Sequence, residues 1–184
     1  IQALKSYGLM GCKSETKFIP IEYKFSSIDQ RLAILQGLLD TDGTATRRGE
    51  IYFSSSSIRL ASDAQDIVHS LGGTASIYKR ETKFLPSYTL IINLSKSLTP
   101  FRLDRKQNRY TTANRKRHPR RGIKQVTYLA FEECQCISVK AKNGLYLTNN
   151  YIVTHNTMGF AISFQCSSER LQETILKENY ADEA

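Results

Sequence analysis

The stretch that most constrains this chain is an apolar segment ending in two closely spaced carboxylates. It reads LQGLLDTDG, from Leu35 to Gly43. Ser27 followed by Gln30 forms a capping box just upstream. Apolar residues then recur at helical spacing, at Ile28, Leu32, Leu35, Leu38 and Leu39. The pattern predicts a helix that begins after Ser27 and ends at Gly43.

Asp40 and Asp42 place two carboxylates where this helix ends. Hard divalent cations prefer oxygen ligands, and two-metal sites stabilise the attacking and leaving oxygens of phosphodiester hydrolysis. Gly37 has no side chain, so another backbone can approach it closely. A paired copy of the helix would bring two acidic ends together around cations. A calcium loop is excluded, because its twelfth position counted from Asp40 is Ile51 rather than Glu.

Further elements follow this helix in alternation. We expect a strand at residues 50–57 and an amphipathic helix at residues 58–71, closed by a Gly-Gly pair. Residues 74–81 and 87–94 are predicted to be two strands. The order is helix, strand pair, helix, strand pair, which indicates an α+β fold.

The charge is unevenly distributed. The chain has 26 Lys and Arg against 17 Asp and Glu, a net charge of +9. Residues 157–184 hold five acids and two bases, so that tail carries −3 and the first 156 residues carry +9 + 3 = +12. A basic body indicates a polyanion partner, most often nucleic acid. Ten bases lie within residues 102–124, which we interpret as a solvated loop or a phosphate-gripping segment.

Membrane and disulfide chemistry are not indicated. No apolar run is long enough to cross a bilayer, and the first residues make a poor signal peptide. The four cysteines lack zinc-site spacing. We therefore expect a cytoplasmic protein with reduced thiols and no membrane partner.

The acidic motif resembles that of the LAGLIDADG homing endonucleases, over roughly residues 26–110. The resemblance implies site-specific cleavage of double-stranded DNA with Mg²⁺. It assigns the metal to the Asp42 carboxylate and the Thr41 carbonyl, and gives Asp40 a role in shaping the helix end with Gly37 and Gly43. It also implies an active-site base after the last strand pair, Lys106 or alternatively Arg105.

The same resemblance implies a DNA-binding sheet. Alternation along a strand places Tyr52 and Ser54 on one face, and we expect Lys79 on the next strand to read the major groove with them. Phosphate contacts would supply most of the affinity. The candidates are Arg47, Arg48, Lys83, Arg105 and Arg109.

The family needs two motifs. Residues 1–25 resemble the approach to the second motif of duplicated enzymes, so we interpret them as a connector from an upstream half. Its end, KFIPIEYKF, is expected to be extended because Pro20 disfavours helix.

A second chemical signal is the triplet His155-Asn156-Thr157. An Asn side-chain amide can attack its own carbonyl and cleave the peptide bond that follows. His155 can assist the proton transfers, and the Thr157 hydroxyl can accept an acyl group. The dipeptide His-Asn alone arises by chance in roughly one chain in six of this length.

The surrounding sequence, residues 133–157, resembles the C-terminal splicing region of inteins. The resemblance implies that Asn156 cyclises, that His155 assists and that Thr157 is the first extein nucleophile. Cys136 falls where many inteins have Asp or Cys. Leu145 stands where many have an assisting His. We expect a Hint-type arrangement, with a CISV strand (136–139), an Asn143-Gly144 hairpin turn, and strands at LYLT and YIVT.

These signals predict four regions: a connector (1–25), an endonuclease half-domain with its basic segment (26–126), a splicing segment (127–156) and the start of the C-extein (157–184). Residues 157–184 are expected to be helical. Ile1 is neither Cys nor Ser, so we expect splicing to require a missing N-terminal part. One hypothesis is that Thr157 completes a Gly-Lys-Thr phosphate loop of the host protein.

Two alternatives to this reading stay open. One is a degenerate endonuclease that acts only as a DNA-binding module. The other is a free-standing homodimeric endonuclease with a chance His-Asn pair. The sequence does not decide among them.

Overall fold

Two stretches of the chain fold as separate units, residues 1–120 and residues 121–184. The computed structural model describes residues 2–112, 119–130, 137–155, 162–167 and 170–175. In this described part no helix is both long and apolar enough to cross a membrane.

Helix α3 (Ile28–Asp42) forms where the sequence predicts it. The Ser27 hydroxyl accepts the Gln30 backbone N–H at 3.3 Å, and the Gln30 side chain accepts the Ser27 N–H at 3.3 Å. The helix ends at Gly43, whose N–H donates to the Leu39 carbonyl. A Cβ at Gly43 would lie 2.5 Å from that carbonyl oxygen, so the chain can leave the helix in this way only at a glycine.

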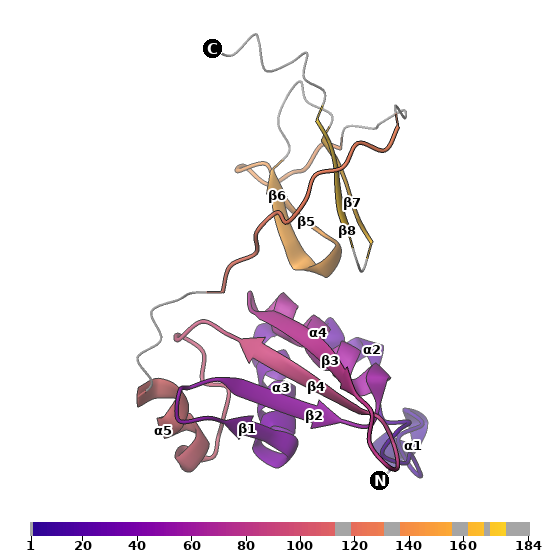
Figure 1. Cartoon of the computed structure of the whole chain (residues 1–184), viewed down its shortest axis with the longest axis vertical. Helices are drawn as coiled ribbons and strands as arrows, with labels where there is room; N and C mark the ends of the chain where they lie inside the picture. The colour runs from indigo at the N-terminus through magenta and orange to yellow at the C-terminus, as the bar shows by residue number, and fades with distance from the viewer. Residues whose placement is uncertain (1, 113–118, 131–136, 156–161, 168–169, 176–184) are drawn as a thin grey trace. The chain divides into compact units, whose positions relative to one another are not determined.

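A four-stranded antiparallel sheet packs on α3 and on α4 (Ile58–Ser70). In Figure 1 both helices lie behind the sheet. The strand order is β1-β2-β4-β3. The strands are β1 (Gly43–Ala45), β2 (Ile51–Ser55), β3 (Thr74–Arg80) and β4 (Ser87–Asn93). The predicted helix–strand order is therefore confirmed for this unit.

The register separates the sheet into two faces. Phe53 pairs with Leu90, which pairs with Ile77, and the row Ile51, Ile92, Ala75 lies on the same side. These residues pack against the buried side chains of α3 and α4. Their neighbours in sequence form the opposite side, which we call the outer face: Thr44, Tyr52, Ser54, Ser76, Tyr78, Arg80, Ser87, Thr89 and Ile91.

Three further helices flank this core. They are α1 (Gln2–Ser6), α2 (Ile21–Lys24) and α5 (Asp104–Thr112). The expected extended piece at residues 17–25 is wrong over α2, because proline restricts the residue before it and suits the start of a helix. Helix α5 lies within the basic run that we interpreted as a solvated loop or a phosphate-gripping segment, and residues 104–112 of that run are helical. Its buried residues, Lys106 and Tyr110, are one turn apart and supply the packing that stabilises it.

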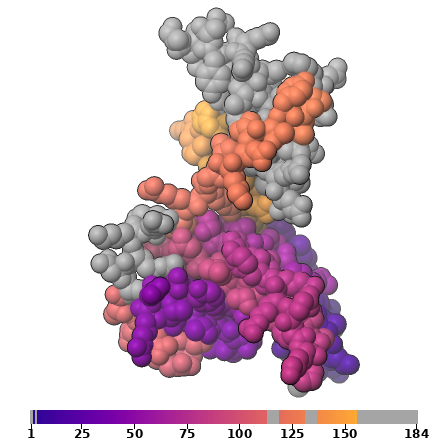
Figure 2. Space-filling model, in the orientation of Figure 1, coloured from indigo at the N-terminus to yellow at the C-terminus, as the bar shows by residue number. Residues whose placement is uncertain are grey.

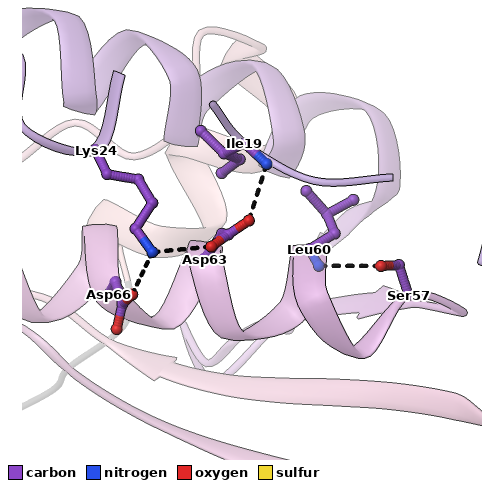
Figure 3. Close-up of polar contacts among 6 residues, drawn as sticks. All are labelled: Ile19, Lys24, Ser57, Leu60, Asp63 and Asp66. Carbon is purple, nitrogen blue, oxygen red and sulfur yellow. Dashed lines mark hydrogen bonds and ion pairs between the residues drawn. The ribbon is translucent and has the colours of Figure 1, made fainter. Parts of the chain in front are cut away.

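Polar contacts attach residues 17–25 to α4 (Figure 3). The Lys24 ammonium lies 2.9 Å from Asp63 and 2.6 Å from Asp66. Asp63 also accepts the Ile19 N–H at 2.9 Å, and Ile19 is buried. The Ser57 hydroxyl caps α4 by accepting the Leu60 N–H and donates to the Lys17 carbonyl at 2.6 Å. We call the contacts of Lys24 and Ile19 with Asp63 and Asp66 the α4 clamp.

Two hairpins form among the residues of the second unit that the structure describes. Strands β5 (Leu145–Thr148) and β6 (Ile152–His155) pair through the turn Asn149–Tyr151, where Asn150 and Tyr151 have positive φ. The predicted strands LYLT and YIVT are confirmed. Residues 137–139 of the predicted CISV strand are not in strand conformation. The chain does turn at Asn143-Gly144, where the Gly144 N–H donates to the Ala141 carbonyl at 2.9 Å.

The predicted C-terminal helix is wrong over its described residues. Strands β7 (Ile162–Ser167) and β8 (Arg170–Ile175) pair antiparallel there. The sequence ISFQCS alternates apolar and polar residues with period 2, which favours a strand over a helix.

Candidate functional site

The two carboxylates at the end of α3 have different surroundings. The Asp40 oxygens accept the backbone N–H groups of Arg102 at 3.1 Å and Leu103 at 3.3 Å. These amides lie immediately before α5, where a helix start leaves N–H groups without intrahelical partners. Asp40 therefore joins the end of one helix to the beginning of another. Asp40 was expected to shape the end of the helix, and these two hydrogen bonds are the contacts through which it would do so.

A side-chain network extends this junction along α3. The Gln36 amide donates to the Thr99 carbonyl at 2.6 Å, and its oxygen accepts from Arg102 Nε at 2.9 Å. Gln36 is only 9% exposed. The segment between β4 and α5 is thus held along the length of the helix and not only at its end.

Asp42 is exposed and makes no hydrogen bond or ion pair within the described part of the chain. The neighbouring Thr41 hydroxyl donates back to the Gly37 and Leu38 carbonyls, at 3.0 and 3.1 Å. The Thr41 carbonyl belongs to the last turn, where carbonyls lack intrahelical donors. A free carboxylate and a helix-end carbonyl are the hard oxygen donors that Mg²⁺ takes. Among the described residues, however, no group of three His, Cys, Asp or Glu gathers around a metal site.

Lys106 is buried beneath the same helix end. Its ammonium donates to the carbonyls of Leu39 at 2.8 Å, Asp40 at 2.8 Å and Gly43 at 2.6 Å. A lysine ammonium has three donors, so all are used on the backbone. Burial lowers the pKa of Lys106, and the Arg105 charge lowers this pKa further. The geometry gives Lys106 the position of a cap on α3, and Arg105 is exposed.

Gly37 lies at the middle of α3 with open space beside it. A Cβ built at this position would meet no atom within 4 Å outside the helix itself. Glycine inside a helix costs about 1 kcal/mol relative to alanine. Nothing within the described structure requires a glycine at position 37. At Gly43, in contrast, a Cβ would collide with the Leu39 carbonyl. The feature fits close approach by a second helix.

The outer face carries part of the expected DNA-reading set. Tyr52 and Ser54 lie there, and Ser54 shares a hydrogen bond of 3.0 Å with Thr89. Lys79 does not, because it pairs with Tyr88 in the row of Ser55, on the core side of the sheet. It forms an ion pair with Glu81 at 2.6 Å. Sequence reasoning missed Arg80, whose outward position follows once Ile77 is assigned to the core.

The expected phosphate contacts lie at several edges of the first unit. Arg47 and Arg48 are exposed in the β1–β2 turn, and Lys83 is exposed in the β3–β4 turn. Arg109 on α5 is exposed and donates to the Ala45 carbonyl at 3.4 Å. Their contact with DNA stays a prediction.

The His-Asn-Thr triplet is described only at its first residue. His155 ends β6, is exposed and pairs directly across from Leu145. Leu147 and Val153 form the next pair on the same side of the hairpin. Cys136, Asn156 and Thr157 lie outside the described residues.

Sequence comparison agrees with this geometry in the first unit. Residues 29–103 match the profile described as the LAGLIDADG-like domain. This region is similar to LAGLIDADG-like domains. Such domains are typical of nuclease enzymes of the homing endonuclease type and generally use a divalent metal. The LAGLIDADG-like domain contains Asp40, Asp42 and the whole sheet, whereas the α2 segment and α5 with Lys106 lie just outside the match.

The chain is also similar to a replicative DNA helicase, DnaB, of Mycobacterium intracellulare. The two are 33% identical over 183 residues. The similarity covers 94% of this chain, and the chain spans 31% of the relative's length. It therefore extends well beyond the LAGLIDADG-like domain on both sides.

Proposed function

We propose that the LAGLIDADG-like domain is one half of a Mg²⁺-dependent endonuclease that cleaves double-stranded DNA. The observation that carries this proposal is the difference between the two acids of the motif. Asp40 is committed to backbone amides, whereas Asp42 has no described partner. Asp40 fixes the end of α3, and Asp42 is exposed to solvent beside it.

Asp42 and the Thr41 carbonyl would hold the cation together with the matching residues of a second motif. Bound there, Mg²⁺ would supply Lewis-acid stabilisation of the charged phosphate oxygens. This chain's own contribution is to fix the two ligands. Asp40 and Lys106 do so by holding the last turn of α3 against the start of α5.

Gly37 supports pairing with a second motif. Two helices that meet at glycine pack with their backbones close, which brings both acidic ends together. In the proposal the partner is an upstream half joined through residues 1–25. The alternative is a second copy of this chain in a homodimer. Sedimentation of the full-length polypeptide separates the two, because only the homodimer depends on protein concentration.

Cleavage tests the nuclease directly. The full-length protein is incubated with Mg²⁺ and a duplex of the uninterrupted host gene. We expect double-strand cleavage by the wild type and none by Asp42→Asn, which keeps the side-chain shape but loses the charge. Asp29→Asn, the same change at the exposed opposite end of α3, serves as the matched control and should cleave as the wild type does. Cleavage by Asp42→Asn at the wild-type rate contradicts the metal assignment.

A second candidate is a DNA-binding module that no longer cleaves. The commitment of Lys106 to three carbonyls favours it, because a base needs a free lone pair and this ammonium is fully engaged. Binding of the same duplex without cleavage in any divalent metal would support this candidate.

We further propose that residues 127–156 are the C-terminal part of a protein-splicing domain. Its support is the triplet His155-Asn156-Thr157, whose first residue is the last residue of the hairpin strand β6. In this proposal Asn156 cyclises with help from His155, the bond to Thr157 breaks, and Cys136 assists near the junction. The endonuclease half-domain would then be an insertion within an intein.

Mass spectrometry tests the splicing proposal. With an N-terminal splicing segment supplied in the same polypeptide, we expect an excised product ending at Asn156 and ligated flanking sequences. Asn156→Ala removes the cyclising amide and should abolish release of the segment after it. Asn149→Ala, in the turn of the same hairpin, is the matched control. Unchanged release from Asn156→Ala contradicts the assignment.

The host protein in this proposal is a replicative helicase, with Thr157 completing a Gly-Lys-Thr phosphate loop. The similarity to the mycobacterial helicase beyond residues 29–103 supports it. Sequencing the upstream flank is the test. A flank without Gly-x-x-x-x-Gly-Lys refutes the phosphate-loop hypothesis.

A further inference from the structure

The turn between β3 and β4 displays an aromatic side chain in solvent. Phe84 is 94% exposed, more than any other large apolar residue among those described. Thr82 orders the turn, since its hydroxyl donates to the Leu85 carbonyl at 2.6 Å and accepts the Phe84 N–H at 3.2 Å. Phe84 is therefore held outward on a hydrogen-bonded turn.

Two cationic residues, Arg80 and Lys83, lie close to Phe84 in the sequence. Arg80, Thr82 and Lys83 line a shallow hollow together with Glu81. The charge of Glu81 is balanced by its ion pair with Lys79 at 2.6 Å. Arg80 and Lys83 make no ion pair within the described part of the chain, so the turn has a net positive surface. In Figure 2 this hairpin projects at the lower right of the view.

The turn is continuous with the outer face of the sheet. Arg80 and Ser87 are the last pair of the β3–β4 ladder and belong to that face. A ligand that lies along the outer face meets the positive hollow and then Phe84. Duplex DNA fits this order, because its phosphates suit Arg and Lys while its base steps accept an apolar wedge.

We propose that Phe84 is a wedge that inserts between base pairs of bound duplex DNA, with Arg80 and Lys83 holding the adjacent phosphates. The wedge unstacks one base step and bends the duplex at the end of the contact made by the outer face. This inference rests on the proposed DNA-binding function, and it adds a contact and a deformation that cleavage chemistry does not require.

The test uses the full chain and a mixed-sequence duplex of about 30 base pairs. The duplex carries 2-aminopurine, which brightens when unstacked, and end labels that report bending by energy transfer. We expect the wild type to raise both signals. Phe84→Ala should abolish both and weaken binding about five- to tenfold. Phe84→Tyr should retain them, since the ring is kept.

Ile58→Ala is the matched control, because Ile58 is 50% exposed on α4, which covers the opposite side of the sheet. It should leave binding and both signals unchanged. If the wild type binds duplex but neither signal changes and Phe84→Ala binds equally well, the wedge is refuted while DNA binding stands. If the wild type binds anionic phospholipid vesicles and no duplex, the wedge and the proposed function fall together.

Discussion

Lys106 and Arg105 are neighbours on α5 with opposite surroundings. The Lys106 ammonium satisfies three backbone carbonyls, whereas Arg105 is exposed. Lys106→Met leaves buried carbonyls without a donor, and we expect it to lower the free energy of unfolding by about 2–3 kcal/mol. Arg105→Met should change it by less than about 0.5 kcal/mol. Urea unfolding of both variants measures the difference, and equal effects would contradict the capping role.

Substitution of Gly37 by alanine is expected to raise the free energy of unfolding, whereas Lys106→Met is expected to lower it. Gly37→Ala fills open space and removes the helix cost of glycine, so the free energy of unfolding of this chain should rise by about 1 kcal/mol. Gly37→Leu should leave this chain folded by circular dichroism but abolish cleavage by the full-length protein. Wild-type cleavage by Gly37→Leu would show that no second helix approaches this position.

The sequence shows the candidate site where the chemistry is local. The Asp-x-Asp-Gly end of an apolar helix displays both carboxylates, whereas the choice of Asp42 as the metal ligand comes from the family resemblance and stays a prediction. The bonds of Asp40 to amides more than 60 residues away depend on tertiary folding, and no local pattern reports them. Lys79 was placed wrongly because a strand that is half polar has an ambiguous phase. The core contacts of Ala75 and Ile77 fix that phase.

At the level of elements, the α4 clamp has a defined pH dependence. Burial acts to lower the pKa of Lys24, but hydrogen bonds and charges from Asp66 and Asp63 outweigh it, so the pKa is raised above 10.5. Because the pKa of Lys24 is higher in the folded than in the unfolded protein, the Lys24 charge stabilises the fold at any pH below its unfolded-state pKa. This stabilisation is lost as the pH rises through the pKa of Lys24 in the folded protein.

We therefore expect the stability difference between wild type and Lys24→Met to be constant from neutral pH to about pH 9.5 and to shrink above 10.5. Thermal unfolding across this range measures it. Lys5→Met, at an exposed lysine of α1, controls for general lysine titration. A difference that shrinks in mild acid instead would point to the carboxylates as the controlling groups.

Elements whose apolar residues recur at regular helical or strand spacing were predicted well. Elements stabilised by a few tertiary contacts were not. Helices α3 and α4 have caps and apolar faces that sequence displays directly. Helix α5 is polar almost throughout, and it is stabilised by Tyr110, whose hydroxyl donates to the Leu94 and Ser95 carbonyls. That contact is invisible to a periodicity argument.

At the level of the whole first unit, the folded domain extends beyond the 29–103 match. Ile19 and Tyr110 are 7% and 1% exposed and belong to the same core as the sheet. Removing them forfeits about 1.5–3 kcal/mol each of apolar burial. A chain of residues 17–112 should unfold cooperatively, and one of residues 29–103 should show a much lower urea midpoint. Equal midpoints would show that the flanking segments are dispensable.

The alternation of the sheet has a consequence for how such a domain changes over evolutionary time. Tyr52, Ser76 and Thr89 each stand between residues that pack in the core, yet their own side chains lie on the opposite face. Substitution at these positions alters the surface offered to a ligand while leaving the interior intact. The two faces can therefore diverge at different rates, and a lineage can acquire a new binding preference without first losing its fold.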